Sequence, residues 1–150
     1  MTTSQAAPRL APEGAPRPNR ADLTPLLFLE RAARAFGERA ALVHGRRRHT
    51  YRELRERVHR LATALRSAGI QPGDRVAVLA PNGPAALEGH YGVPLAGAIL
   101  VAINTRLAPA EIGYILQHSG ARALLVDSEL SPLVAPVLGD CPDLQTVVNV

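Results

Sequence analysis

Two kinds of hydrophobic pattern alternate along the chain from Thr24 onward. In one kind, apolar residues recur every three or four positions, which predicts amphipathic helices over 25–37, 50–69 and 109–119. In the other kind, short apolar runs are almost uninterrupted, as in strands that are buried on both faces. These runs cover 75–80, 99–103, 123–126 and 146–150. A further helix is expected from about 85 to 96 and a short one near 133–138.

Local signals fix some of the boundaries. Thr24 followed by Pro25 is typical of a helix start, with Thr24 as the N-cap. Thr50 and Glu53 have the spacing of a capping box at the start of the second helix. Between these helices, residues 40–43 and 47–51 are expected to pair as a short β-hairpin around a turn at 44–46. Gly120 is expected to end the helix 109–119.

The order of these elements predicts an α/β fold. Strands that alternate with helices favour a mainly parallel, doubly wound sheet with helices on both faces, here preceded by a helix and a small β-hairpin. A length of 150 residues suits one domain. We expect it at 23–150, after a disordered tail rich in Pro, Ala and Arg at 1–22. Because the chain stops inside the apolar run 147–150, we expect the domain to be truncated at its C-terminal end.

Composition narrows the chemistry. No apolar stretch is long enough to cross a membrane, because charges, Gly or Pro interrupt each one. All 17 basic residues are Arg, so chemistry that needs a lysine, including a Schiff base or a P-loop, is excluded from these 150 residues. The single cysteine, Cys141, cannot form an internal disulfide and is interpreted as a structural thiol. With no signal peptide in view, the expected location is the cytoplasm.

Most candidate sites have a structural interpretation. Neither glycine-rich phosphate signature is present after the strand 75–80, and the five histidines form no metal-ligand cluster. His90 is interpreted as a core or boundary residue on its helix. The arginines between 46 and 60 could bind nucleic acid, but Glu53 with Arg57, and Glu56 with Arg60, have the spacing of helical ion pairs. We therefore interpret this stretch as a solvated face.

Arg106 is the most informative single residue. It lies in the sequence Asn104-Thr105-Arg106-Leu107, directly after the predicted strand 99–103. Ligands of open parallel sheets bind at the carboxyl ends of the strands, and a planar guanidinium suits a phosphate group. The alternative from position alone is that Arg106 ties its loop to a nearby carboxylate.

Several short motifs resemble one family. They are Thr50-Tyr51-Arg52-Glu53-Leu54, the segment from Gly69 to Val78, Pro81-Asn82, the segment from Gly92 to Ala98, and Asn104-Thr105-Arg106-Leu107. In this order and spacing, over about 24–150, they resemble the N-terminal region of the AMP-forming adenylating enzymes (acyl-CoA synthetases). Within that family the chain is most similar to fatty-acyl-CoA ligases for medium or long chains.

The resemblance implies a two-step ligase reaction. A carboxylic acid reacts with ATP to give an acyl-adenylate and pyrophosphate, and coenzyme A then takes the acyl group, with Mg²⁺ neutralising the phosphates. The family's phosphate loop, ribose-binding acid and catalytic lysine lie beyond Val150. No catalytic or metal-binding residue is therefore assigned in this chain, which is expected to be inactive alone. By the same resemblance, Arg106 is a candidate contact for a coenzyme A phosphate.

Two alternatives from other classes stay open at this point. One is a freestanding basic α/β module that binds nucleic acid through the arginine-rich hairpin and helix, with affinity that falls steeply with salt. The other is a non-catalytic dimerising or regulatory fragment. The oligomeric state cannot be predicted from these features.

Overall fold

A computed structural model describes residues 23–150, so the tail predicted at 1–22 lies outside the described residues. The helices are α1 (Pro25–Ala35), α2 (Tyr51–Ser67), α3 (Pro84–Leu95), α4 (Pro109–Ser119) and α5 (Ser131–Val134), followed by the 3₁₀ helix η1 (Ala135–Asp140). The strands are β1 (Ala40–His44), β2 (Arg47–Thr50), β3 (Arg75–Leu79), β4 (Ile99–Ala102), β5 (Ala121–Val126) and β6 (Thr146–Asn149). Each predicted element is present, with boundaries that differ from the prediction by a few residues at most.

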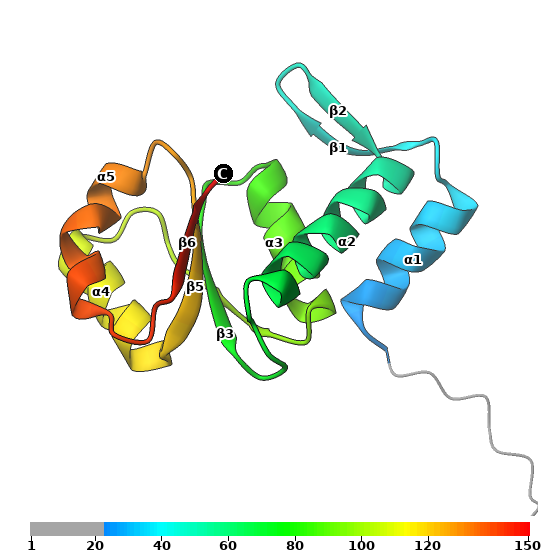
Figure 1. The fold of residues 1–150 in the computed structure, drawn as a ribbon. Helices are drawn as coiled ribbons and strands as arrows, with labels where there is room; N and C mark the ends of the chain where they lie inside the picture. The colour runs from blue at the N-terminus through cyan, green and yellow to red at the C-terminus, as the bar shows by residue number, and fades with distance from the viewer. Residues whose placement is uncertain (1–22) are drawn as a thin grey trace, which may run out of the picture.

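The main sheet has the order β4-β3-β5-β6, and each neighbouring pair is parallel. Figure 1 shows β3, β5 and β6 side by side. Val76 of β3 is in register with Leu100 of β4 on one side and with Ala123 of β5 on the other. The predicted parallel sheet is therefore confirmed. β1 and β2 pair separately as the expected antiparallel hairpin.

Side chains of β3 divide the core into two layers. Val76 and Val78 face one hydrophobic cluster, which includes Ala62 of α2 and Val93 of α3. Ala77 and Leu79 face the opposite cluster, which includes residues of α4, α5 and η1. Because successive side chains of a strand point to opposite faces, this division confirms that helices cover both faces of the sheet. Burial of one side chain such as Leu79 contributes roughly 1.5–3 kcal/mol to folding.

The hairpin and the first two helices form a smaller cluster beside the sheet. Its buried members are Leu29, Leu54 and Val58. The Thr50–Glu53 capping box is confirmed: the Glu53 N–H donates to Thr50 Oγ1 at 3.2 Å, and the Thr50 N–H donates to Glu53 Oε2 at 2.7 Å. Thr24 does occupy the N-cap position of α1, but its side chain makes no capping hydrogen bond.

Glycines bring α3 close to its neighbours. A Cβ atom placed on Gly92 would lie 2.7 Å from Leu61 Cδ2 of α2, and one placed on Gly89 would lie 3.0 Å from Val78 Cγ2 of β3. The absence of these side chains sets the depth at which α3 packs between α2 and the sheet. α3 in turn begins directly at the carboxyl edge of the sheet, where the candidate site lies.

Candidate functional site

The loops that follow β3, β4 and β5 meet at one edge of the molecule because all three strands run in the same direction. β4 lies on one side of β3 and β5 lies on the other, so the chain reverses its direction of travel across the sheet after β4. As a result, the connection after β3 (through α3) and the connection after β5 (through α5) cover opposite faces of the sheet. Such a reversal opens a crevice at the carboxyl edge, which is where open α/β sheets bind their ligands.

Arg106 lies at this edge, as predicted. It lines a cavity of about 400 Å³, together with Asn82 of the loop after β3 and Asn104 of the loop after β4. The Arg106 N–H donates to Asn104 Oδ1 at 3.0 Å, which holds the backbone in an Asx turn. The side chain of Arg106 is exposed.

The alternative role for Arg106 was an ion pair with a neighbouring carboxylate. None of the ion pairs within residues 23–150 involves this arginine. Within the described residues, no carboxylate occupies the Arg106 guanidinium, so it is available to bind a ligand.

A second cavity, of about 220 Å³, lies at the same edge between the hairpin, α2, α3 and the loop after β5. Charged groups of both signs line it: Arg47, Arg57, Glu88 and Asp127. Arg57 is already paired with Glu88, with Nη2 to Oε2 at 3.2 Å. The residues come from distant parts of the sequence, and no local motif marks them, which is why sequence analysis missed this cavity.

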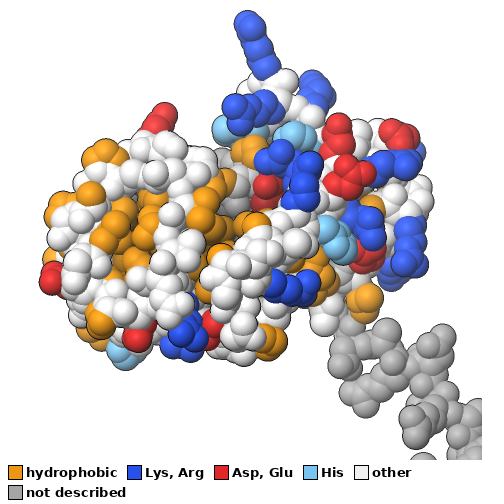
Figure 2. All heavy atoms as spheres, in the orientation of Figure 1, with side chains coloured by type: hydrophobic (Ala, Val, Ile, Leu, Met, Phe, Trp, Pro, Cys, Tyr) orange, Lys and Arg blue, Asp and Glu red, His pale blue; other side chains and the backbone are white. Residues whose placement is uncertain are grey.

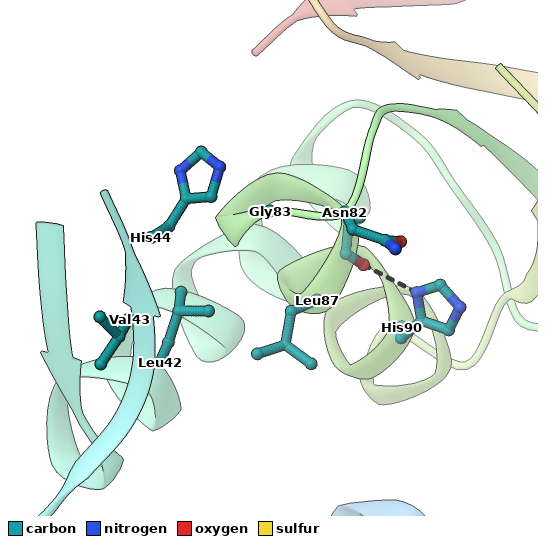
Figure 3. Close-up of a pocket in the computed structure, with 8 residues that line it drawn as sticks. Leu42, Val43, His44, Asn82, Gly83, Leu87 and His90 are labelled. Atoms are coloured by element: carbon teal, nitrogen blue, oxygen red, sulfur yellow. Dashed lines mark hydrogen bonds between the residues drawn. The ribbon is translucent and has the colours of Figure 1, made fainter. Parts of the chain in front are cut away.

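A third, largely apolar groove separates β1 from α3 (Figure 3). It has a volume of about 420 Å³, and Leu42 and Leu87 face it from the two sides. His90 lies at its α3 side, is exposed, and is joined to the Ala86 carbonyl by a hydrogen bond from Nδ1 at 2.7 Å. The prediction placed His90 in the core or at its boundary, and a core position is wrong. No carboxylate of residues 23–150 pairs with His90.

The arginines of α2 do not form the ion pairs that the sequence predicted. Arg57 does not pair with Glu53, because the Glu53 carboxylate caps the Thr50 N–H and Arg57 reaches Glu88 on α3 instead. Arg60 makes no ion pair with Glu56 within the described residues. Other arginines of α2 are paired across elements. Arg55 contacts Glu30 at 2.8 Å, and Arg52 contacts Glu38 at 2.6 Å.

Charged side chains are concentrated on the surface of the hairpin, α1 and α2. Figure 2 shows Arg, Asp, Glu and His side chains gathered over the hairpin, α1 and α2, whereas hydrophobic and neutral atoms dominate the half that contains β6. Burial would raise the pKa of Glu30, but hydrogen bonds from His59 and Arg55 outweigh it and lower that pKa. The carboxylate therefore stays ionised and paired.

Cys141 is buried, and its Sγ–H donates to the Val137 carbonyl at 3.3 Å. Burial, with the nearby charge of Asp140, raises the pKa of this thiol. Both observations agree with a structural role. Across residues 23–150, no group of three or more His, Cys, Asp or Glu side chains is placed to hold a metal ion.

The sheet topology and its edge loops thus define an open α/β protein with its binding edge at the carboxyl ends of the strands. The chain belongs to the AMP-binding enzyme family, whose family model matches residues 29–150. This match confirms the resemblance that the sequence motifs indicated.

Relatives with assigned activities are named as CoA ligases. The chain is 44% identical over 111 residues to an acetate/butyrate–CoA ligase of Arabidopsis thaliana, a match that covers 74% of this chain and 20% of the relative. It is 47% identical over 111 residues to a trans-cinnamate:CoA ligase of Petunia hybrida, with the same coverage. The chain thus spans about a fifth of the length of the curated relatives it matches.

Solved structures show the same fold. An anthranilate CoA ligase in complex with anthranoyl-AMP matches with a TM-score of 0.81 and 31% identity, over 83% of this chain and 24% of that one. The N-terminal domain of FACL13 from Mycobacterium tuberculosis matches with a TM-score of 0.78 and 30% identity, over 83% of this chain and 33% of that one. In the described part of the present chain, no helix is both long and apolar enough to cross a membrane.

Proposed function

We propose that residues 23–150 are the N-terminal part of an AMP-forming acid–thiol ligase. In the proposed reaction, a carboxylate oxygen attacks the α-phosphate of ATP, pyrophosphate leaves, and an acyl-adenylate forms. The thiol of coenzyme A then attacks the acyl carbonyl, and AMP leaves. Mg²⁺ neutralises the phosphate charge in this chemistry. The observation that carries the proposal is the family match over residues 29–150 together with relatives named as CoA ligases at 44% and 47% identity.

The acid is proposed to be a medium- or long-chain fatty acid. This preference comes from the motif resemblance, and it is supported by a matching structure described as a Mycobacterium tuberculosis fatty acyl CoA synthetase, with 30% identity. Relatives named for acetate, butyrate, cinnamate and benzoate make short and aromatic acids the competing substrates. A panel of acids from acetate to palmitate, with benzoate included, distinguishes these classes by their kcat/KM values.

Arg106 is proposed to bind a phosphate of coenzyme A. Its support is threefold: the residue lies at the carboxyl edge of the sheet, its backbone is held by Asn104, and no ion pair of the described residues occupies its guanidinium. A charge-assisted, bidentate contact of this kind contributes about 1.5–3 kcal/mol. Removing it raises the KM for coenzyme A by about tenfold or more.

The 150 residues alone are proposed to be inactive. They contain no lysine, so they cannot supply the family's catalytic lysine, and they match only about a fifth of the relatives' length. Purified residues 1–150 should release no pyrophosphate from ATP in the presence of a fatty acid. Turnover above that of heat-denatured protein would place the chemistry within this chain and contradict the proposal.

The Arg106 assignment is tested in a longer ligase that contains this chain. Arg106→Ala should raise the KM for coenzyme A and leave acid-dependent ATP–pyrophosphate exchange unchanged, because exchange does not use coenzyme A. Arg60→Ala is the matched control, since Arg60 is also exposed and makes no ion pair among the described residues. An unchanged KM in Arg106→Ala would remove the assignment.

Two further expectations stay predictions. The cytoplasmic location rests on the lone cysteine, whereas several relatives are named as peroxisomal. The absence of nucleic-acid binding rests on the pairing of Arg52, Arg55 and Arg57 with carboxylates, which lowers the free positive charge of α2.

A further inference from the structure

The outward surface of α1 is unusual in composition. At 100° per residue, Leu27, Phe28, Arg31, Arg34 and Ala35 fall within an arc of about 120°, and they face away from Leu29, which is buried. We call these five residues the outer face of α1.

Large apolar side chains on and beside this face are open to solvent. Phe28 is 51% exposed and Leu27 is 39% exposed. Leu23, before the helix, is 82% exposed, and Phe36, after it, is 50% exposed. Four of the large hydrophobic residues with substantial exposure thus cluster on one short segment. An apolar surface of this kind on a helix indicates that something covers it.

The charges on the outer face of α1 are of one sign. Glu30 is turned inward, where it accepts hydrogen bonds from Arg55 and His59, each at 2.8 Å. Glu38 is paired with Arg52 at 2.6 Å. Arg31 and Arg34 make no ion pair among the described residues, so the outer face presents two free guanidinium groups and no free carboxylate.

We propose that the outer face of α1 binds an anionic membrane surface, with α1 lying in the plane of the lipid head groups. Interleaved Arg, Leu and Phe side chains are the pattern of interfacial helices, because the apolar groups enter the acyl boundary while the arginines meet lipid phosphates. Leu23, Leu27 and Phe28 precede the segment matched by the family model, which begins at residue 29. The surface is separate from the Arg106 site and does not depend on the proposed reaction.

Other occupants fit less well. A symmetric contact with a second copy would bring Arg31 and Arg34 of both copies together with no carboxylate between them, and like charges in contact repel. Nucleic acid would satisfy the arginines, but its phosphates would leave Leu27 and Leu23 exposed. An anionic lipid surface is both charged and apolar, so it satisfies both kinds of group.

Vesicle flotation tests the proposal on the 150-residue chain. The chain should float with vesicles of phosphatidylcholine and phosphatidylglycerol in equal parts and stay in solution with pure phosphatidylcholine. Arg31→Gln with Arg34→Gln should lower the partition coefficient by about tenfold or more, since each arginine near an anionic surface contributes about a fivefold gain. Leu27→Gln with Phe28→Gln should lower it to a similar extent, with an unchanged circular dichroism spectrum.

The matched control removes two positive charges from a surface other than the outer face of α1. Arg46→Gln with Arg48→Gln acts at the hairpin turn, which points away from α1 (Figure 1), where neither arginine has an ion pair among the described residues. This variant should bind as the wild-type chain does, within about threefold. An equal loss in both arginine variants would show that general charge drives binding and would overturn the assignment to α1.

Tryptophan fluorescence tests directly whether the outer face of α1 enters the lipid. The chain has no tryptophan, so Phe28→Trp introduces a single probe. Its emission should shift to shorter wavelength on the anionic vesicles and be quenched by brominated lipid. Tyr114→Trp, at the 63% exposed Tyr114 on α4, should show neither effect. A Phe28→Trp spectrum that does not change on vesicles would overturn the proposal, as would a stable dimer in which the probe is shielded without lipid.

Discussion

Arg57 of α2 and Glu88 of α3 form a two-pronged ion pair, with Nε to Oε1 at 2.5 Å and Nη2 to Oε2 at 3.2 Å. The Glu88 side chain is only 12% exposed, whereas that of Arg57 is 38% exposed. The contact joins two helices that cover the same face of the sheet. It also lines the cavity at the carboxyl edge, so it links the packing of α2 and α3 to the shape of the candidate site.

Arg57→Ala should lower the free energy of unfolding by about 1–3 kcal/mol, because it leaves the mostly buried Glu88 carboxylate without its partner. Urea denaturation followed by circular dichroism measures the change. Arg46→Ala, at an exposed arginine of the hairpin turn, should alter it by no more than about 0.5 kcal/mol. Equal effects in the two variants would show that the ion pair contributes no stability of its own.

Gly92→Ala should also destabilise the chain, through steric overlap. The added Cβ would lie 2.7 Å from Leu61 Cδ2 and 3.1 Å from Leu61 Cβ, so rotation of the leucine alone does not relieve it. We expect a loss of about 1–3 kcal/mol. Gly139→Ala is the matched control, because a Cβ there meets no atom within 4 Å. Thermal unfolding compares the two, and an unchanged melting temperature for Gly92→Ala would mean that α2 and α3 pack less closely than described.

Stability should fall at acidic pH partly through Asp74, a buried acid directly before β3. The Gln71 N–H donates to its carboxylate at 2.8 Å, and this bond, with Arg122, lowers the pKa of Asp74 below its ordinary value of 3.8. Because the pKa of Asp74 is lower in the folded state, its ionised carboxylate stabilises the fold at pH values above 3.8. This stabilisation is lost as the pH falls from 3.8 to the folded-state pKa.

Asp74→Asn tests this account of the acid dependence. The variant should be less stable than the wild-type chain at neutral pH, and the difference should shrink as the pH falls from 3.8 toward the lower folded-state pKa of Asp74. Denaturation curves across this range measure the difference. A gap between the two proteins that does not depend on pH would show that charge at Asp74 is not responsible.

Thr50→Ala should cost about 1 kcal/mol, since it removes the hydroxyl that accepts from the Glu53 N–H at the start of α2. Thr50→Ser retains that oxygen and should restore most of the loss. Chemical denaturation of the two variants measures both effects. If Ser and Ala at this position are equally destabilising, the capping hydrogen bond is not what stabilises the helix start.

This capping box illustrates how much local pattern can predict. Thr50 and Glu53 are three residues apart, and both capping bonds follow from that spacing. The strands were predictable for a similar reason, because a run such as residues 76–79 is apolar at each position only if both faces of the sheet are covered. Gly120 was recognisable as a helix end, and its φ of 60° confirms the left-handed conformation that glycine favours.

Pairing between distant elements was not predictable. The spacing of Glu53 and Arg57 suits a helical ion pair, but Glu53 is used by the capping box and Arg57 reaches Glu88, 31 residues later. Which of two partners an arginine takes depends on how α2 and α3 pack, and that depends on Gly92 and Leu61. Arg106 was placed correctly at the edge because a loop after a parallel strand can lie nowhere else. Its freedom from ion pairs within residues 23–150 became visible only in the structure.

The assignment to a CoA ligase is tested most directly by two half-reactions of a longer ligase that contains residues 1–150. Acid-dependent exchange of pyrophosphate into ATP measures adenylate formation, and thioester formation measures transfer to coenzyme A. We predict that both occur with a fatty acid and that Arg106→Ala impairs only the second. A protein that supports neither half-reaction with any acid of the panel would contradict the account.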